Sequence, residues 1–204
     1  MSTMMKPKYE NAEFMLSVSH LSQLPPDQGI EVAIIGRSNA GKSSVLNQLT
    51  HNKNLARVSK TPGRTQHINL FALDKKRRLA DLPGYGYANV PYALKQKWEL
   101  LLDAYLRNRD SLQGLILVMD IRYPFKDFDK KLLIWSSQCQ LPVHILLNKV
   151  DKITLQTLKK TLRKVNDAVP IYPNIVTYQT FSALRGIGIN ELRKKLDEWF
   201  TLDF

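Results

Sequence analysis

The sequence is poor in several features that define common protein classes. The 204 residues include one cysteine, Cys139, nine glycines and ten prolines. One cysteine excludes an intrachain disulfide framework and a cysteine-cluster zinc site, and it fits a reducing compartment. The glycine and proline content is too low for a collagenous or disordered chain. No run of about 18 apolar residues occurs, and no apolar core follows the polar residues 1–10. We therefore expect a cytoplasmic protein without a membrane span or a membrane partner.

Acidic residues are also few. Asp and Glu number 18 against 30 Lys and Arg, which gives a net charge of +12. Residues 31–80 carry ten basic and two acidic side chains, a net of +8, so two thirds of the excess lies in a quarter of the chain. Such a local excess favours a polyanionic partner such as nucleic acid. A basic surface that only faces solvent is the alternative.

The order of apolar segments predicts one α/β domain over residues 30–204, preceded by a polar lead-in, residues 1–29, that ends in the turn sequence LPPDQG. We expect strands over 30–35, 66–73, 78–82, 115–119, 143–147 and 175–181. We expect helices over 43–49, 92–108, 126–138, 154–168 and 189–200. This alternation predicts three layers: a mainly parallel six-stranded sheet with one antiparallel edge hairpin, and helices on both faces.

A glycine-rich loop follows the first expected strand. Its residues are Gly36, Arg37, Ser38, Asn39, Ala40, Gly41, Lys42 and Ser43, which match G-x-x-x-x-G-K-[ST] between a strand and a helix. The glycines let the backbone approach a phosphate, and successive N–H groups at a helix N-terminus face the anion. Lys42 reaches the β and γ phosphates, and the Ser43 hydroxyl can bind Mg²⁺ directly. The loop predicts a nucleotide site but does not identify the base.

The segment Asn148-Lys149-Val150-Asp151 predicts the base. It follows an apolar strand, where open α/β sheets bind ligands. The Asp151 carboxylate can accept hydrogen bonds from N1–H and N2–H of guanine, whereas adenine would leave it unpaired. Capping of a helix by Asp151 is the alternative, and both can hold. Phe181, Ser182 and Ala183, after the last strand, resemble the loop whose backbone N–H contacts guanine O6.

Asp81, Leu82, Pro83 and Gly84 form a D-x-x-G sequence at the end of the third strand. Asp81 can hold Mg²⁺ through a water, and the Gly84 N–H can meet the γ-phosphate. Thr65 supplies the second direct hydroxyl for Mg²⁺, because it immediately precedes the edge strand; Thr61 is the alternative. We assign catalytic roles to Lys42, Thr65 and Gly84.

Five segments in order, GRSNAGKS, Thr65 in PGRTQ, DLPG, NKVD and SAL, resemble the translation-factor-related P-loop GTPases. GRSNAGKSS, KTPGRTQ and DLPGYGYA are more specifically similar to the EngB/YihA/YsxC family of bacterial ribosome-assembly GTPases, which belongs to the TrmE-Era-EngA-EngB-septin-like group. The resemblance spans nearly the whole chain. One departure is NKVD, since this family more often begins the motif with Thr.

The resemblance implies several properties. These are GTP and GDP binding with slow hydrolysis, a Mg²⁺ cofactor, association with rRNA and ribosomal protein of the large ribosomal subunit, and a link to cell division and septation. It also places Gly63, Arg64 and Thr65 at the nucleotide and suggests a monomer. Asn39 is further implied to bind K⁺ beside the phosphates; a purely structural role in the loop is the alternative.

Other assignments stay open at this stage. Tyr85 occupies the position after D-x-x-G where many GTPases place glutamine, so we expect slow hydrolysis. Tyr85, Tyr87 and Tyr92 are candidates for core packing and, equally, for RNA stacking. The basic tip Lys75–Arg78 is either solvated or meets phosphates. A P-loop small-molecule kinase and a nucleotide-independent RNA-binding protein remain as alternative functions.

Overall fold

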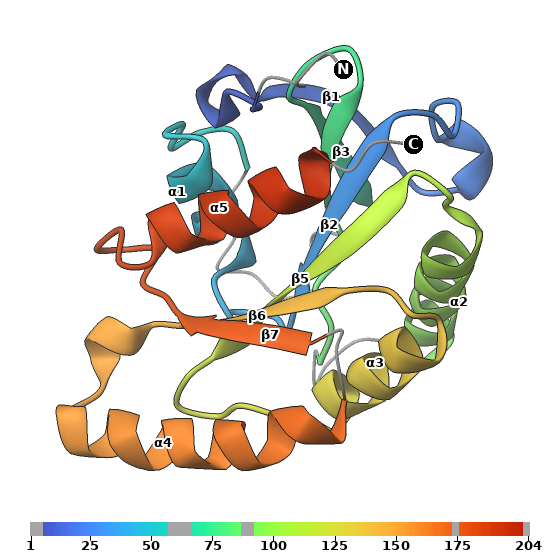
Figure 1. Cartoon of the computed structure of the whole chain (residues 1–204). Coiled ribbons are helices and arrows are strands. Elements are labelled where there is room, and N and C mark those ends of the chain that lie inside the picture. The colour runs from blue at the N-terminus through green and yellow to red at the C-terminus, as the bar shows by residue number, and fades with distance from the viewer. Residues whose placement is uncertain (1–5, 57–66, 87–91, 173–175, 202–204) are drawn as a thin grey trace.

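A seven-stranded sheet forms the centre of the computed structural model, which describes residues 6–56, 67–86, 92–172 and 176–201 (Figure 1). The strand order is β1-β3-β4-β2-β5-β6-β7. The strands are β1 Glu13–Val18, β2 Ile30–Gly36, β3 Ile68–Ala72, β4 Arg77–Asp81, β5 Leu112–Asp120, β6 Val143–Asn148 and β7 Val176–Thr180. Strands β2, β4, β5, β6 and β7 pair in parallel, while β3 is antiparallel to β4 and β1. The mainly parallel sheet with an antiparallel edge hairpin is confirmed.

The expected strand number was wrong by one. The segment 1–29, read as a polar lead-in, supplies β1, which extends the antiparallel edge by pairing with β3 from Glu13–Ala72 to Val18–Ile68. The register shifts between Phe14 and Leu16, so the strand is irregular. Most of its side chains are exposed or half-buried, and only Val18 is fully buried. The short apolar run Phe14–Leu16 does not alternate with polar residues, so β1 does not show the pattern of a half-buried strand.

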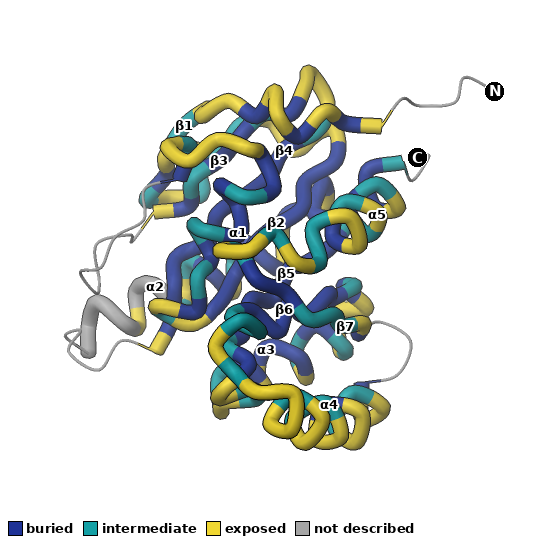
Figure 2. The backbone as a smooth tube through the Cα atoms, turned by 90° about the vertical axis from the view of Figure 1, so that its left-hand side faces the viewer, coloured by how far each residue is buried: buried dark blue, intermediate teal, exposed yellow. Residues whose placement is uncertain are grey.

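Helices cover both faces of the sheet, which gives the expected three layers. The α-helices are α1 Lys42–Leu49, α2 Tyr92–Asn108, α3 Asp127–Gln138, α4 Leu155–Ala168 and α5 Ile189–Phe200; 3₁₀ turns occupy Tyr9–Asn11, Leu21–Gln23, Val150–Lys152 and Val169–Ile171. Buried residues of α1 and α5 pack on one face, and those of α2, α3 and α4 pack on the other. Figure 2 shows the buried strands between these exposed helical surfaces.

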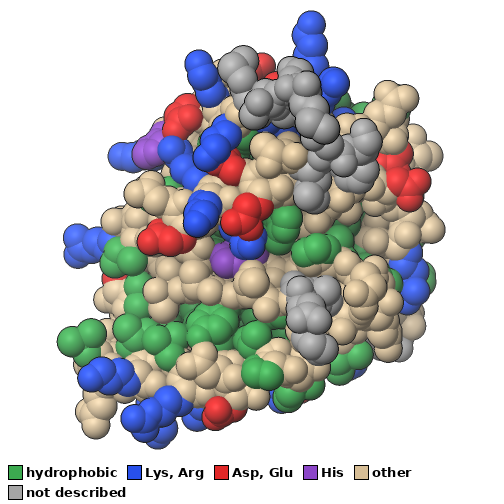
Figure 3. All heavy atoms as spheres, viewed as in Figure 1, with side chains coloured by type: hydrophobic (Ala, Val, Ile, Leu, Met, Phe, Trp, Pro, Cys, Tyr) green, Lys and Arg blue, Asp and Glu red, His purple; other side chains and the backbone are tan. Residues whose placement is uncertain are grey.

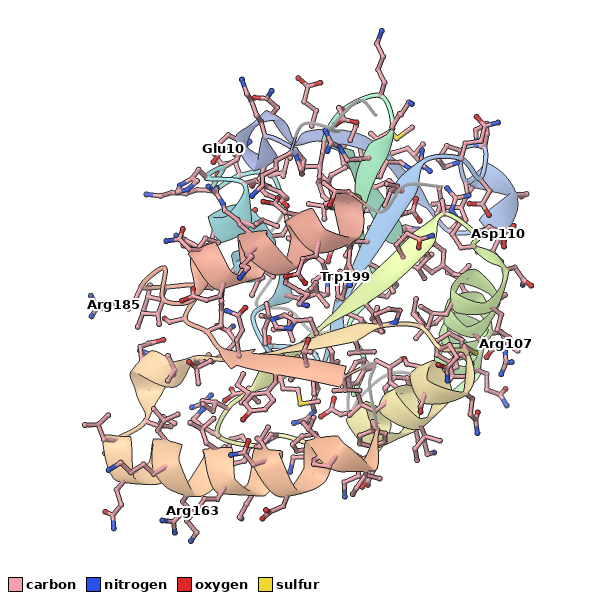
Figure 4. All side chains as sticks on the ribbon, in the orientation of Figure 1. Glu10, Arg107, Asp110, Arg163, Arg185 and Trp199 are labelled. Carbon is pink, nitrogen blue, oxygen red and sulfur yellow. The ribbon has the colours of Figure 1, made fainter. Side chains whose placement is uncertain are left out.

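Strand β2 lies at the centre and is buried along its whole length. Its side chains alternate between the two cores: Ala33 and Ile35 face the α2–α4 side, and Val32 and Ile34 face the α1–α5 side. Neighbouring β5 also serves both layers, and its Gly114 is where Trp199 of α5 packs (Figure 4). A Cβ atom at Gly114 would lie 2.5 Å from the Trp199 ring, so this close contact requires glycine.

A buried ionic network fixes the turn that enters β2. The Glu31 carboxylate accepts hydrogen bonds from Arg78 at 3.0 Å, from Arg109 at 3.2 Å and from the Tyr105 hydroxyl. Arg78 and Arg109 also donate to the backbone oxygens of Gln28 and Pro25. The network ties the turn to β4 and the start of β5, at the end of the sheet opposite the phosphate loop.

Across the described ranges, no helix has the length and apolarity that spanning a membrane requires.

Candidate functional site

The sequence motifs within the described residues meet at the C-terminal ends of the parallel strands. The glycine-rich loop connects β2 to α1, and Gly41 adopts a left-handed conformation with φ of 100°. A Cβ at Gly41 would lie 2.4 Å from the Asn148 amide nitrogen, and a Cβ at Gly36 would lie 2.4 Å from the Val118 oxygen. Both glycines are therefore required by the close approach of this loop to β5 and β6.

Lys42 and Asp81 form an ion pair at the centre of the site. Lys42 begins α1, Asp81 ends β4, and both side chains are buried. The pair brings the predicted phosphate-binding lysine to the D-x-x-G carboxylate. Leu82, the next residue, packs in the core while its N–H donates to Ile34, and Pro83 and Gly84 are also buried. The D-x-x-G segment is thus held beside the glycine-rich loop.

Asn148 joins three of the predicted segments. Its amide nitrogen donates to the Ala40 oxygen at 2.8 Å, and its amide oxygen accepts from the Ala183 N–H at 3.1 Å. The next residue, Lys149, has a left-handed φ of 70°, and its ammonium donates to the Asn39 oxygen at 2.5 Å. The NKVD segment therefore connects the phosphate loop to the 181–183 loop, at sequence separations of about 110 and 35 residues.

Asp151 lies beside Ser182, as expected for one base-recognition site. The Ser182 hydroxyl donates to the Asp151 carboxylate at 2.5 Å, and it accepts from the Arg185 N–H at 3.1 Å. The hydrogen bond from Ser182 lowers the pKa of Asp151, so the carboxylate is ionised at neutral pH. Phe181 is fully buried and its oxygen accepts from the Val150 N–H, which fixes the two loops to each other. Asp151 is also the middle residue of a short 3₁₀ turn.

Tyr85 is a core residue, which decides one of the open alternatives. Its ring packs against Phe128 with centroids 4.3 Å apart, and its hydroxyl donates to the Asp129 carboxylate. Burial raises the pKa of both groups. The Tyr85 backbone also brackets the phosphate loop, because its N–H donates to Gly36 and its oxygen accepts from Ser38. Tyr85 therefore packs inside the protein and offers no ring for RNA stacking.

Asp120 lies beside the phosphate loop, and sequence reasoning did not single it out. It ends β5 and accepts hydrogen bonds from Arg122 at 2.6 and 2.9 Å and from Lys149 at 2.9 Å. Burial alone would raise the pKa of Asp120, but these bonds outweigh it and lower the pKa to about 2. The carboxylate holds Lys149 against the phosphate loop. The sequence did indicate this residue: Asp120 is acidic and ends an apolar strand, and that strand lies beside the one that carries NKVD.

Several predicted residues lie outside the described ranges or keep untested roles. Gly63, Arg64, Thr65, its alternative Thr61 and Tyr87 fall in the segments that the structure does not describe. Arg37, Ser38, Asn39 and Ala40 line one side of a cavity of about 320 Å³, together with Asp120 and Lys149. The hydrogen bonds above bring the predicted segments together; which of their atoms touch a nucleotide stays a prediction.

The described residues fit a magnesium–phosphate site better than an all-protein metal site. Among the described residues, no three or more His, Cys, Asp or Glu side chains gather in a way that could hold a metal ion. Magnesium commonly takes one or two protein ligands and completes its shell with substrate phosphates and waters. The buried Asp81 carboxylate and the hydroxyl of Ser43, in the first turn of α1, are oxygen donors of the kind that magnesium takes, and their role at Mg²⁺ stays a prediction.

Comparison with known proteins places the chain among GTPases. Residues 31–149 match the family model described as "50S ribosome-binding GTPase". A "Probable GTP-binding protein EngB" of Coxiella burnetii (strain RSA 493 / Nine Mile phase I) is 51% identical over 194 residues, 95% of both chains. One from Idiomarina loihiensis is 50% identical over 196 residues, covering 96% of this chain and 95% of its own.

Solved structures share the fold. A crystal structure of a "probable GTP-binding protein engB" superposes with a TM-score of 0.66 at 22% identity, covering 83% of this chain and 98% of its own. Era, solved in complex with MgGDPNP and a segment of 16S ribosomal RNA, gives a TM-score of 0.67 at 21% identity over 87% of this chain and 58% of its own. On the strength of the sequence matches, this chain belongs to the EngB family of P-loop GTPases.

Proposed function

We propose that this protein is a guanine-nucleotide switch, a slow Mg²⁺-dependent GTPase that acts in assembly of the large ribosomal subunit. The observation that carries the nucleotide part is the double hydrogen bond of Asn148. It attaches the phosphate loop at Ala40 to the Ser182 loop at Ala183, and Asp151 follows three residues later in the same segment as Asn148. A base held by Asp151 and a phosphate chain held by residues 36–43 then fit one ligand. The family membership argues against the small-molecule kinase alternative.

Each polar group of the site has a separate role in this proposal. Lys42, now paired with Asp81, turns its ammonium toward the β and γ phosphates when GTP binds. Ser43 directly and Asp81 through a water would hold Mg²⁺, with Thr65 as the further hydroxyl, and the ion would neutralise phosphate charge when bound. The Gly84 N–H, beside the same site, meets the γ-phosphate. The γ-phosphate is present in GTP and absent from GDP, so this contact forms only before hydrolysis. The segment after Asp81 therefore has two states, one with the contact and one without it.

Slow hydrolysis follows from Tyr85. Its hydroxyl is engaged by Asp129 and its ring is 2% exposed, so it does not orient an attacking water as a glutamine does. We propose that Asn39 compensates by holding K⁺ beside the phosphates. Its backbone oxygen already accepts from Lys149, so the carboxamide oxygen is the atom offered to the ion.

The large-subunit part of the proposal is supported by the description of the matching family and by charge. Lys75 and Lys76 are exposed at the β3–β4 hairpin, whose basic side chains project at the top of the face in Figure 3. Beside them lies a cavity of about 650 Å³, also lined by Arg77, Arg78 and residues 25–30. We propose that this surface meets rRNA phosphates and that ribosomal protein completes the contact.

The cellular part of the proposal is indirect. We propose that the protein acts as a cytoplasmic monomer and that loss of large subunits links it to cell division and septation. Depletion in growing cells should then lower mature large subunits before cells elongate. Elongation with an unchanged ribosome profile would contradict this order of events.

Titration of fluorescent GDP, GTP and ATP analogues tests the nucleotide part directly. Guanine-only binding with release of inorganic phosphate, and no acceptor substrate, is the expected result. Co-sedimentation with purified large subunits in the presence of a non-hydrolysable GTP analogue tests the second part. Equal co-sedimentation with GDP, with the GTP analogue and without nucleotide would contradict a switch and favour a nucleotide-independent RNA-binding protein.

A further inference from the structure

The loop between β5 and α3 presents an exposed aromatic ring with two cations near it. Tyr123 is 58% exposed, although it lies beside the phosphate loop. The Arg122 guanidinium carbon lies 5.7 Å from its ring centroid and the Lys126 ammonium lies 5.5 Å from it. Both distances are within the range of about 6 Å over which a cation is attracted to an aromatic ring. The ring and its charges form one surface patch, Arg122, Tyr123 and Lys126.

This patch borders the cavity of about 320 Å³ at the phosphate loop. Arg37, Ser38 and Asn39 line its other side. The volume is at the lower end of the range for small-ligand pockets, about 300–1,000 Å³. Four of the lining residues are cationic, Arg37, Arg122, Lys126 and Lys149, and two are acidic, Asp120 and Asp129. The lining of the cavity therefore carries a net positive charge and includes the exposed Tyr123 side chain.

The positions of the charges are set by the fold. Asp120 orients Arg122 through two hydrogen bonds, which keeps the guanidinium plane fixed near the Tyr123 ring. Lys126 immediately precedes α3, and its N–H is held by the Asp129 carboxylate at 2.8 Å. Tyr123 itself is anchored by a backbone hydrogen bond to the Asp120 oxygen at 2.9 Å. These hydrogen bonds fix the Arg122 guanidinium and the backbone of the turn that carries Tyr123 and Lys126.

We propose that Arg122, Tyr123 and Lys126 bind one unpaired nucleotide of RNA, its base stacked on Tyr123 and its phosphate held by the two cations. An unpaired nucleotide has both features that the patch matches, a π-face and an anion. An acidic peptide would use the cations but would leave the ring without a partner. The inference rests on the proposed function, because ribosomal RNA is the RNA such a protein meets.

The position gives this contact a role of its own. Asp120 is shared between Arg122 and Lys149, and Lys149 holds the Asn39 oxygen of the phosphate loop. RNA bound at Tyr123 therefore lies two side chains away from the nucleotide site. The basic β3–β4 hairpin lies at the other ends of the strands, so the two surfaces are separate contacts and can be tested separately.

The test uses a fluorescein-labelled, non-self-complementary ten-nucleotide RNA and fluorescence anisotropy with the full chain. Tyr123→Ala is expected to weaken RNA affinity about tenfold and Lys126→Ala to weaken it by a factor of about three to ten. Tyr123→Phe keeps the ring and should stay within twofold of the wild type. The matched control for the lysine is Lys130→Ala, an exposed lysine one turn further along α3, which should have no effect.

Three results would overturn the inference. The wild type binds no RNA, the RNA affinity of Tyr123→Ala is within twofold of the wild type, or Lys126→Ala and Lys130→Ala lose equal RNA affinity. Displacement of the RNA by free UMP at equal nucleotide concentration would show a mononucleotide site instead. Displacement by a poly-glutamate peptide of equal charge would show that the patch recognises charge alone.

Failure of the inference is distinguishable from failure of the proposed function. Co-sedimentation with large subunits and titration with guanine nucleotides are measured on the same variants. If the wild type binds neither guanine nucleotide nor large subunits, the proposed function fails, whatever the RNA assay shows. If it binds both, and Tyr123→Ala binds the ten-nucleotide RNA as the wild type does, only the Tyr123 patch is wrong.

Discussion

The ammonium of Lys42 is paired with the carboxylate of Asp81 inside the predicted phosphate site. Both groups are buried, so each compensates the charge of the other until a ligand arrives. In the proposed switch, phosphate oxygens compete with Asp81 for this ammonium. Lys42 therefore has two roles: its ammonium binds phosphate when a ligand is present, and it stabilises the ligand-free fold by compensating the charge of Asp81.

Replacing Lys42 by Met should lower both the affinity for GTP and the stability of the ligand-free protein, and the two losses can be measured separately. The variant keeps the apolar stem and loses the charge. We expect GTP affinity to fall about 10- to 100-fold, because a charge-assisted hydrogen bond is lost. The ligand-free protein should also unfold at a lower temperature, since Asp81 remains buried without its partner. Isothermal titration and thermal unfolding measure the two effects, and GTP affinity within threefold of the wild type would contradict the phosphate-site assignment.

Replacing Asp151 by Asn should change which base is accepted. The carboxylate can accept from both N1–H and N2–H of guanine, whereas the carboxamide presents one donor. The ratio of GTP to ATP affinity should fall at least about 100-fold. Xanthine carries an oxygen where guanine carries its 2-amino group, so XTP should bind the variant better than GTP does. Competition against a fluorescent analogue checks this, and an unchanged base preference would remove Asp151 from the base site.

The base site could be foreseen because it follows from local sequence at strand ends. NKVD follows the apolar β6 and the 181–183 segment follows β7, and parallel neighbours bring their C-terminal ends together. The Ser182–Asp151 hydrogen bond then follows directly from the topology. Most elements were likewise predicted to within a few residues, since alternation of buried strands with amphipathic helices is a strong pattern.

The parts that could not be foreseen depend on tertiary contacts. Strand β5 begins at Leu112, three residues earlier than expected, because Gly114 is a site of close packing against Trp199 and does not end the strand. Glu31 is fully buried in β2, which no sequence pattern would predict, since its cations Arg78 and Arg109 lie 47 and 78 residues away. The irregular edge strand β1 was missed for a related reason: its partner β3 stabilises it, and its own sequence does not.

The β3–β4 hairpin should contribute to the salt dependence of large-subunit binding. Lys75 and Lys76 are exposed, whereas Arg77 is paired with Asp74 at 2.6 Å. Replacing Lys75, Lys76 and Arg77 by Ala should reduce the slope of log affinity against log salt by about two to three. Nucleotide affinity should not change, because the hairpin and the phosphate loop lie at opposite ends of β2 and β4.

The matched control for the hairpin is a set of three basic residues on another element, all of them exposed lysines. Lys159, Lys160 and Lys164 carry the same formal charge on α4, which lies far from the β3–β4 hairpin (Figure 1). Their replacement by Ala should leave the slope closer to that of the wild type. Equal slopes for the two triple variants would show that only net charge matters, and an unchanged slope in the hairpin variant would remove the hairpin from the interface.

His144 should make the protein less stable in mild acid. The ring is buried between Thr177 at 2.7 Å and Gln179 at 2.9 Å, and burial lowers the pKa to about 4 from an ordinary 6.5. The unfolded chain therefore binds a proton that the folded chain does not, between pH 6.5 and 4. This contribution to stability is complete above pH 6.5 and is lost as the pH falls toward 4.

The size of this effect is measurable against a variant that does not titrate. At pH 5 the wild type should lose about 2 kcal/mol of unfolding free energy through this residue, relative to pH 7.5. His144→Gln should lose correspondingly less over the same interval, whatever its stability at pH 7.5. Urea unfolding at the two pH values gives both differences, and equal losses in the two proteins would show that His144 is not buried in the neutral form.

Acceleration by K⁺ is the most specific consequence of the phosphate-loop sequence. Tyr85 is buried and bonded to Asp129, so the residue after D-x-x-G does not orient water, and charge between the β and γ phosphates needs another source of compensation. Asn39 is the side chain of the loop that we assign to K⁺, and hydrolysis should be faster in K⁺ than in Na⁺ at equal ionic strength.

The variant must be chosen with the backbone in mind. Asn39 has a φ of 63°, a left-handed conformation that Asn and Gly tolerate better than Ala, so Asn39→Ala would add backbone strain to the loss of the carboxamide. Asn39→Gly removes the carboxamide while it keeps both this conformation and the backbone oxygen that Lys149 requires. GDP affinity in the glycine variant should stay within a few-fold, and its rate should be the same in K⁺ and Na⁺. If instead the wild type hydrolyses GTP equally fast in both salts, alone and with large subunits, Asn39 only shapes the loop.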